Sequence, residues 1–125
     1  MKLLLDTHIV LWCLTDPGTL AATALPVIRQ EENPLYCSIA SLWEMAVKAS
    51  LGKLRIPAEL FEGLTAARIQ LLPILPEHAL DVSELPPKHG DPFDRLLVAQ
   101  ARREGMTLVT RDQRLRSYSV SILEG

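Results

Sequence analysis

The sequence has few cysteines and no cysteine spacing of the kind that binds zinc. Its two cysteines, Cys13 and Cys37, stand in apolar stretches, without a CxxC pair and without a nearby histidine at ligand spacing. We therefore expect two buried free thiols in a reducing compartment.

The chain also lacks a long apolar run and an excess of basic residues. Asp6 and His8 interrupt the apolar opening MKLLLDTHIVLWCL, whereas a membrane span needs about 20 apolar residues and a signal peptide needs an unbroken apolar segment. We expect a cytoplasmic protein with no membrane contact. A net charge of −2 excludes a protein that binds nucleic acid over a generally basic surface. A polyanionic ligand would need local basic patches or bound cations.

The composition that is present suits one ordinary folded domain. The chain has 125 residues, 48% hydrophobic and 22% charged, with no internal repeat and no low-complexity segment. A domain of this size buries roughly two thirds of its unfolded surface, so it needs no disulfides. We expect residues 1–125 to form a single domain.

Short apolar runs alternate with segments of helical periodicity along almost the whole chain. This alternation predicts a parallel sheet covered by helices on both faces, a three-layer α/β/α fold with about five strands. The predicted strands are Lys2–Leu5, Leu35–Ser38, Leu71–Leu75, Met106–Thr110 and Val120–Leu123, and the predicted helices are His8–Thr15, Leu20–Glu32, Ala40–Ser50, Pro57–Ile69, Pro76–Leu85 and Pro92–Glu104.

Acidic residues fall where such a sheet forms its binding sites, at the carboxyl ends of the strands. Asp6 follows the first strand, Glu44 lies early in the helix after the second, and Asp112 follows the fourth. Asp91 and Asp94 start a helix that runs antiparallel to the strand it feeds, so they lie at the same edge. Four separate segments therefore deliver carboxyl groups to one place.

Each of these acids also has a structural explanation. Asp6, Asp91 and Asp112 could cap helical turns, and Ser41 to Glu44 matches a capping box. Glu44 could instead form an exposed pair with Lys48. Caps do not explain acids within apolar surroundings such as LLLD and SLWEM, because clustered and buried carboxylates are costly to ionise.

A divalent cation would remove that cost, and oxygen ligands favour Mg²⁺ or Mn²⁺. Such a site suits phosphodiester hydrolysis, in which one ion activates water and a second stabilises the leaving oxygen. The sequence contains no GxSxG elbow, no Walker loop and no GxGxxG after the first strand. No protein nucleophile competes with this interpretation.

Four segments resemble the PIN-domain family, and within it the VapC-type ribonuclease toxins of type II toxin–antitoxin pairs. They are LLLDTHIVLW, SIASLWEMAVKASLGKL, HGDPFDRLLVAQA and LVTRDQRL, which span most of the chain in the family's order. The resemblance implies a PIN-like fold and an endoribonuclease whose acids hold Mg²⁺ or Mn²⁺. The implied ligands and catalytic residues are Asp6, Glu44, Asp94 and Asp112, with Asp91, Thr7 and Thr110 in support.

The resemblance further implies partners: an RNA substrate, a homodimer and a cognate antitoxin that shields the site and links the toxin to promoter DNA. RNA phosphates would need cations around the acids. Because most lysines and arginines are simply solvated, this basic set stays an open hypothesis. Its principal members are Lys48, Arg95, Arg111 and Arg114, and Lys53, Arg55 and Arg116 could also contribute. Arg95 could instead pair with an acid.

Two other functions stay open. The acids could bind one structural Mg²⁺ in a non-catalytic regulatory module, or the chain could be an RNA-processing PIN nuclease outside any toxin–antitoxin pair. His8, His78 and His89 are expected to be solvated or hydrogen-bonded, although His8 could touch the acidic edge. We expect Trp12 and Trp43 in the core or at an interface rather than as base-stacking platforms.

Overall fold

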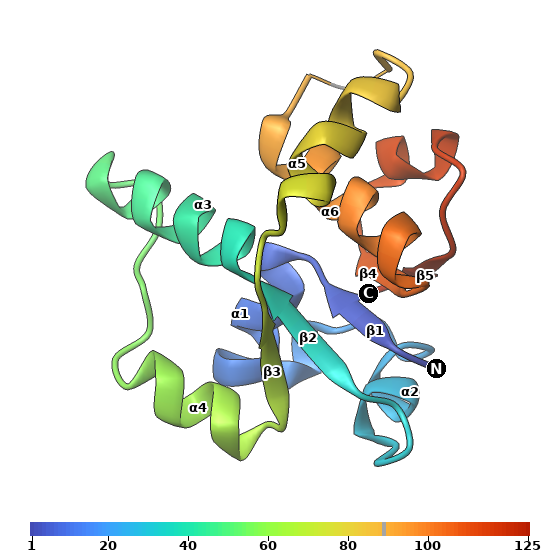
Figure 1. The fold of residues 1–125 in the computed structure, drawn as a ribbon. Helices are drawn as coiled ribbons and strands as arrows, with labels where there is room; N and C mark the ends of the chain where they lie inside the picture. Colours follow the sequence, from blue (N-terminus) through green and yellow to red (C-terminus); the bar gives the residue numbers. More distant parts are fainter. Residues whose placement is uncertain (89) are drawn as a thin grey trace.

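Five strands form one fully parallel sheet in the order β3-β2-β1-β4-β5, with β1 at its centre (Figure 1). The structure is a computed structural model that describes residues 1–88 and 90–125, so the prediction for His89 lies outside it. The strands are β1 (Leu3–Leu5), β2 (Leu35–Ser38), β3 (Ile69–Leu72), β4 (Thr107–Thr110) and β5 (Ile122–Glu124).

Helices connect the strands and cover both faces of the sheet (Figure 1). Short 3-10 turns extend or replace helical segments at three places. The α-helices are α1 (Thr7–Thr15), α2 (Leu25–Arg29), α3 (Ile39–Ser50), α4 (Leu60–Ala66), α5 (Pro76–Asp81) and α6 (Pro92–Glu104), and the 3-10 turns are η1 (Pro17–Thr19), η2 (Val82–Glu84) and η3 (Gln113–Ser117).

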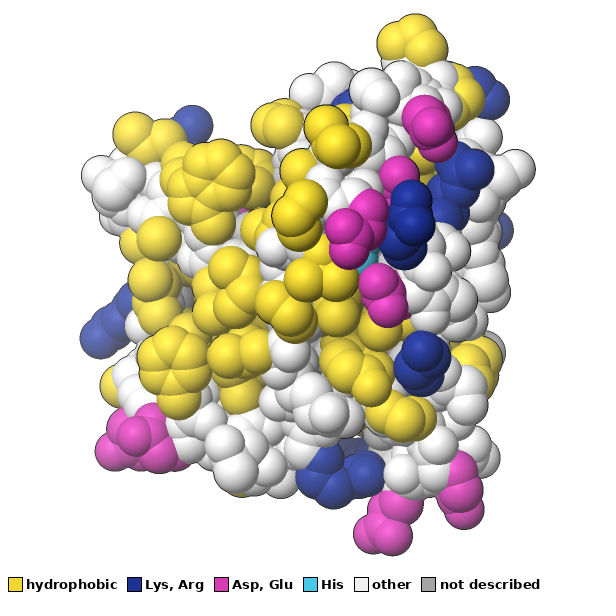
Figure 2. All heavy atoms as spheres, viewed as in Figure 1, with side chains coloured by type: hydrophobic (Ala, Val, Ile, Leu, Met, Phe, Trp, Pro, Cys, Tyr) yellow, Lys and Arg dark blue, Asp and Glu magenta, His cyan; other side chains and the backbone are white. Residues whose placement is uncertain are grey.

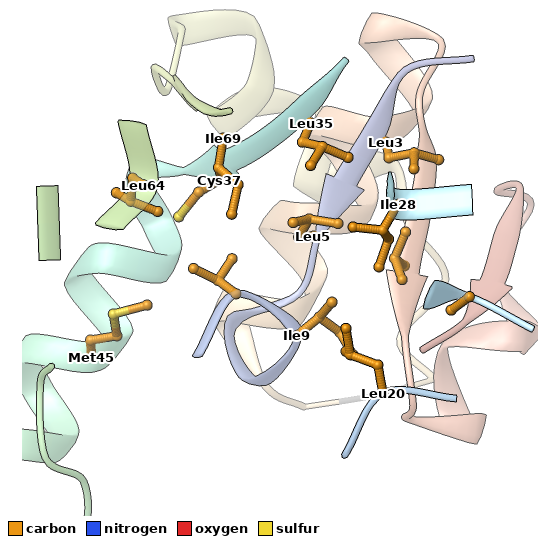
Figure 3. Packing of buried hydrophobic residues seen from close by; sticks show 13 residues of the cluster. Leu3, Leu5, Ile9, Leu20, Ile28, Leu35, Cys37, Met45, Leu64 and Ile69 are labelled. Carbon is orange, nitrogen blue, oxygen red and sulfur yellow. The ribbon is translucent and has the colours of Figure 1, made fainter. Parts of the chain in front are cut away.

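The central strand divides the core in two, because successive side chains of a strand point to opposite faces. Leu3 and Leu5 join the cluster beneath α1, α2 and α4 (Figure 3), whereas Leu4 joins the cluster beneath α6 and η3. All three side chains are fully buried, and burying one leucine contributes about 1.5–3 kcal/mol. The predicted three-layer α/β/α fold with a five-stranded parallel sheet is confirmed.

Of the eleven predicted elements, two have the predicted bounds and six differ only at one or both ends, whereas three are shortened or shifted near proline or left-handed residues. β2 and α6 agree with their predictions, whereas the helix predicted at Leu20–Glu32 is wrong for most of its length. Only Leu25–Arg29 is α-helical there, because Pro26 stands in the first turn and begins the helix rather than kinking it.

The bounds of α4 and β3 also differ from the predicted ones. α4 begins at Leu60 rather than Pro57, after Glu59 in a left-handed conformation (φ 57°). Arg68 takes the left-handed conformation that commonly ends helices (φ 60°), so the chain enters β3 at Ile69, two residues earlier than predicted. Pro73 has no N–H group for the sheet and lies just beyond the end of the strand.

One face of the molecule carries a group of exposed apolar side chains, which we call the apolar face. Figure 2 shows hydrophobic side chains gathered over α3, α4 and the region of β3. Its residues include Ile39, Trp43, Phe61, Leu71 and Leu75, of which Trp43 and Phe61 are 59% and 60% exposed. Among the residues described, no helix has the length and apolar character needed to cross a membrane.

Candidate active site

Asp6 sits at the end of the central strand, where the chain turns directly into α1. Its carboxylate accepts a hydrogen bond from the Thr7 N–H (2.7 Å) and another from the Thr110 hydroxyl of β4 (2.7 Å). Burial raises the pKa of Asp6, and the nearby Glu44 charge adds to this, while the two hydrogen bonds oppose the shift. Asp6 therefore caps α1, as one explanation proposed, and is also a partly buried acid whose charge is costly.

Glu44 is buried beside Asp6, although α3 is otherwise amphipathic. Its side chain is 4% exposed, and it accepts hydrogen bonds from the Thr7 hydroxyl (2.6 Å) and from Lys48 Nζ (2.6 Å). The capping-box explanation is wrong, because Ser38, not Ser41, caps α3. The pair with Lys48 does form, but its Glu44 end is buried rather than exposed. The acid faces the inside of the molecule.

Asp91 and Asp94 come from the start of α6, at the same edge of the sheet. Asp91 caps the helix, because its side chain accepts hydrogen bonds from the N–H groups of Phe93 (2.9 Å) and Asp94 (3.3 Å). Asp94 is only 7% exposed. Because Asp91 fixes the first turn, it also fixes the direction in which Asp94 points.

Asp112 follows β4 and caps η3 through a hydrogen bond from the Arg114 N–H (2.9 Å). Its two carboxylate oxygens also accept from the Arg114 guanidinium at 3.0 and 2.8 Å, a bidentate ion pair. The Asp112 N–H in turn donates to the Thr110 hydroxyl (3.1 Å), which binds Asp6. Thr110 thus connects two acids of the site.

These acids line one pocket of about 190 Å³ between the starts of α1, α3, α6 and η3. All five predicted acids lie there, and the two predicted threonines each donate a hydrogen bond to one of them. The sequence left the contribution of α1 undecided, because neither His8 nor Trp12 stood out from ordinary surface and core residues. The pocket is lined by Asp6, His8, Ile9, Trp12, Glu44, Lys48, Asp91, Asp94, Arg111, Asp112 and Arg114.

Three of the four principal basic residues predicted to contact RNA lie at this pocket, and the fourth does not. Lys48, Arg111 and Arg114 line it. The predicted position of Arg95 at the pocket is wrong. Its guanidinium donates instead to the carbonyl oxygens of Pro86 (2.9 Å) and Val82 (3.1 Å), and to the Tyr118 hydroxyl (3.2 Å). Arg95 therefore ties α6 to neighbouring loops, and it pairs with backbone carbonyls rather than with an acid.

The donor set of the pocket suits a hard divalent cation, because carboxylate oxygens dominate it. Within residues 1–88 and 90–125, however, no three acidic, histidine or cysteine side chains are close enough as they stand to hold one metal ion. Lys48 and Arg114 neutralise Glu44 and Asp112. A bound cation would have to compete with these two ion pairs.

Comparisons with known proteins identify the family of this chain. The chain is 32% identical over 118 residues to Ribonuclease VapC22 of Mycobacterium tuberculosis, which covers 92% of this chain and 90% of that protein. Its fold is similar to a chain in the crystal structure of VapBC2 from Rickettsia felis bound to a promoter DNA fragment, with a TM-score of 0.72 and 19% identity over 99% of this chain and 98% of that one. It is also similar to a chain in the crystal structure of DNA-bound VapBC from Salmonella typhimurium, with a TM-score of 0.67 and 16% identity over 98% of this chain and 97% of that one. The PIN domain family model matches residues 3–120, so the chain belongs to the PIN domain family, as its VapC-like motifs predicted.

Proposed function

We propose that this protein is a divalent-metal-dependent endoribonuclease and the toxin of a toxin–antitoxin pair. The observation that carries the proposal is the meeting of acids from four chain segments in one pocket, with Asp6, Glu44 and Asp94 largely withdrawn from solvent. Helix capping accounts for the position of Asp6 and Asp112, but it does not account for the buried Glu44 and Asp94. The similarity to a protein named as a ribonuclease supports the same conclusion.

In this proposal Asp6, Glu44, Asp94 and Asp112 hold Mg²⁺ or Mn²⁺. The bound ions would supply positive charge for the scissile phosphate and would favour deprotonation of water. The pocket lining described above includes no hydroxyl or thiol side chain, so water is the attacking group.

Neighbouring residues position the acids rather than react. Thr7 holds one oxygen of Glu44, Thr110 holds one oxygen of Asp6, and Asp91 sets the first turn of α6 beneath Asp94. Lys48 and Arg114 would release their carboxylates when a cation binds, and their charges could then contact phosphate oxygens of the RNA. Arg111 adds a third cation to the rim.

The proposed partners follow from the relatives. VapBC complexes pair two proteins, and both solved structures described above contain DNA. We propose a cognate antitoxin that covers the pocket of this chain and provides its only link to DNA. We also propose a homodimer through the apolar face and a cytoplasmic site of action.

Cleavage of RNA by the purified protein tests the proposal. We expect activity in Mg²⁺ or Mn²⁺, none in EDTA, and a loss of at least about a hundredfold in Asp94→Asn, the scale of losing one electrostatic stabiliser. Asp81→Asn is the matched control, because Asp81 forms an exposed ion pair with Arg103 outside the pocket and undergoes the same chemical change. Full activity of Asp94→Asn would refute the mechanism, and metal binding without cleavage would favour the regulatory module.

A further inference from the structure

One wall of the pocket is a row of three side chains, Arg111, Trp12 and His8, which we call the aromatic wall. The Arg111 guanidinium lies 4.3 Å from the centre of the Trp12 ring, and the His8 ring lies 5.9 Å from Trp12 on α1, tilted by 43°. All three line the same pocket as the acids. The wall therefore stands beside the place where the scissile phosphate would bind.

The inner part of the wall is fixed in position. Arg111 donates to the backbone carbonyls of Thr19 and Gly125, so its guanidinium cannot turn away from Trp12. Trp12 is half-buried and packs against the core beneath α1. A rigid cation on a fixed indole is a stable support for further stacking.

The outer part of the wall is open. His8 is exposed, and it lies four residues before Trp12, so both rings are on the same face of α1. A core role would explain Trp12 but not the exposed imidazole that continues the row. The wall thus ends in a free aromatic surface, two residues along the chain from Asp6.

We propose that the aromatic wall is a nucleobase-binding subsite, in which an unpaired base next to the scissile phosphate stacks on His8. This inference rests on the proposed ribonuclease function and narrows its substrate. Bases stack on aromatic rings in single-stranded RNA, loops and bulges, whereas the bases of a duplex are already stacked on each other. The substrate is therefore RNA that is unpaired at the cut.

Binding measurements with His8 variants test the subsite without depending on the rate of cleavage. Each variant is made in an Asp94→Asn background and titrated with a short single-stranded RNA and with an abasic ribose-phosphate chain of the same length. We expect His8→Ala to weaken RNA binding about 5- to 100-fold, the range for losing one stacked base, and to leave the abasic chain unaffected. His8→Phe should keep binding within about twofold of the parent, because it keeps the ring.

A matched control is Phe61→Ala, which removes an exposed aromatic ring of the apolar face, outside the pocket, and should not change RNA binding. Equal RNA affinity of His8→Ala and the parent would overturn the subsite while leaving the nuclease proposal intact. An equal loss in His8→Phe and His8→Ala would show that the ring nitrogens act instead, which also overturns stacking. Failure of the wild-type protein to bind or cleave RNA at all would overturn the function and the subsite together.

Discussion

Replacing Asp6 by asparagine separates a metal site from a set of helix caps. Asn caps a helix about as well as Asp, and its side-chain oxygen can still accept from the Thr7 N–H, so the capping contribution cancels. What changes is the charge, together with the second oxygen, which accepts from the Thr110 hydroxyl and becomes an NH₂ donor. Burial raises the pKa of Asp6, which means that its ionised form is disfavoured in the folded protein, and Asn removes that cost.

The size of the stability change depends on the charged side chains near Asp6. Two carboxylates about 5 Å apart at an effective dielectric near 20 repel by about 3 kcal/mol. The Lys48 and Arg114 ion pairs and solvent screen this repulsion, which leaves on the order of 1 kcal/mol. Without metal, Asp6→Asn should therefore melt about 3–6 °C above the wild type. Saturation a hundredfold above the dissociation constant would stabilise the wild type by about 2.7 kcal/mol, and the variant much less.

The assay is four thermal melts, of wild type and Asp6→Asn, each in EDTA and in millimolar Mn²⁺. We expect the order of stability to reverse between the two conditions. Asp81→Asn provides the control, because it removes an exposed acid whose pKa the Arg103 hydrogen bond lowers, and it should respond to Mn²⁺ as the wild type does. A wild-type melting temperature that ignores Mn²⁺ would leave the site without its physical basis.

Three further outcomes follow from the structure. The apolar face should make the protein a dimer at micromolar concentration, and Trp43→Ser should weaken self-association about tenfold or more in sedimentation; a wild-type monomer would refute this. Burial raises the pKa of Cys13 to about 11 and of Cys37 to about 12, so both thiols should resist a thiol reagent at pH 7 until the protein unfolds; rapid labelling of the native state would contradict this. Arg95→Met should lower the free energy of unfolding by about 2–4 kcal/mol, because it leaves carbonyl groups without donors, and should change RNA cleavage less than twofold; impaired cleavage at unchanged stability would restore Arg95 as an RNA contact.

The sequence predicted best where several local signals agreed. α6 has Asp91 as cap, a proline in its first turn and Gly105 in the left-handed conformation (φ 66°) at its end, so its bounds could be predicted to the residue. The prediction of one helix over Leu20–Glu32 was wrong although its apolar spacing fits a helix. Its apolar residues reach the core from turns as well as from α2. The exposed residues of the apolar face lie outside this segment, so the segment itself gives no support to the proposed dimer.

For the candidate site, the sequence predicted the positions of the acids better than their contacts. The strand ends and helix starts that carry Asp6, Glu44 and Asp94 follow from topology alone, so the sequence located them. The spacing of Glu44 and Lys48 indicated their pair, because residues four apart on a helix are neighbours. The sequence does not show side-chain directions such as that of Arg95, which turns away toward backbone carbonyls. The sequence did not show the aromatic wall, because Arg111, which lies over the Trp12 ring, is far along the chain from α1.

The contact between Asp6 and Thr110 has a consequence for the synthesis of the protein. These residues are 104 positions apart, and the central strand β1 pairs on one side with β2 and on the other with β4, which follows about 100 residues later in the chain. Such a non-local pairing forms late, after the cost of closing a long loop has been met. A nascent chain still missing β4 would lack Asp112, one side of the central strand and the hydroxyl that orients Asp6. The proposed active site would therefore be complete only after β4 and Asp112 have left the ribosome, and fragments that end before β4 should not cleave RNA.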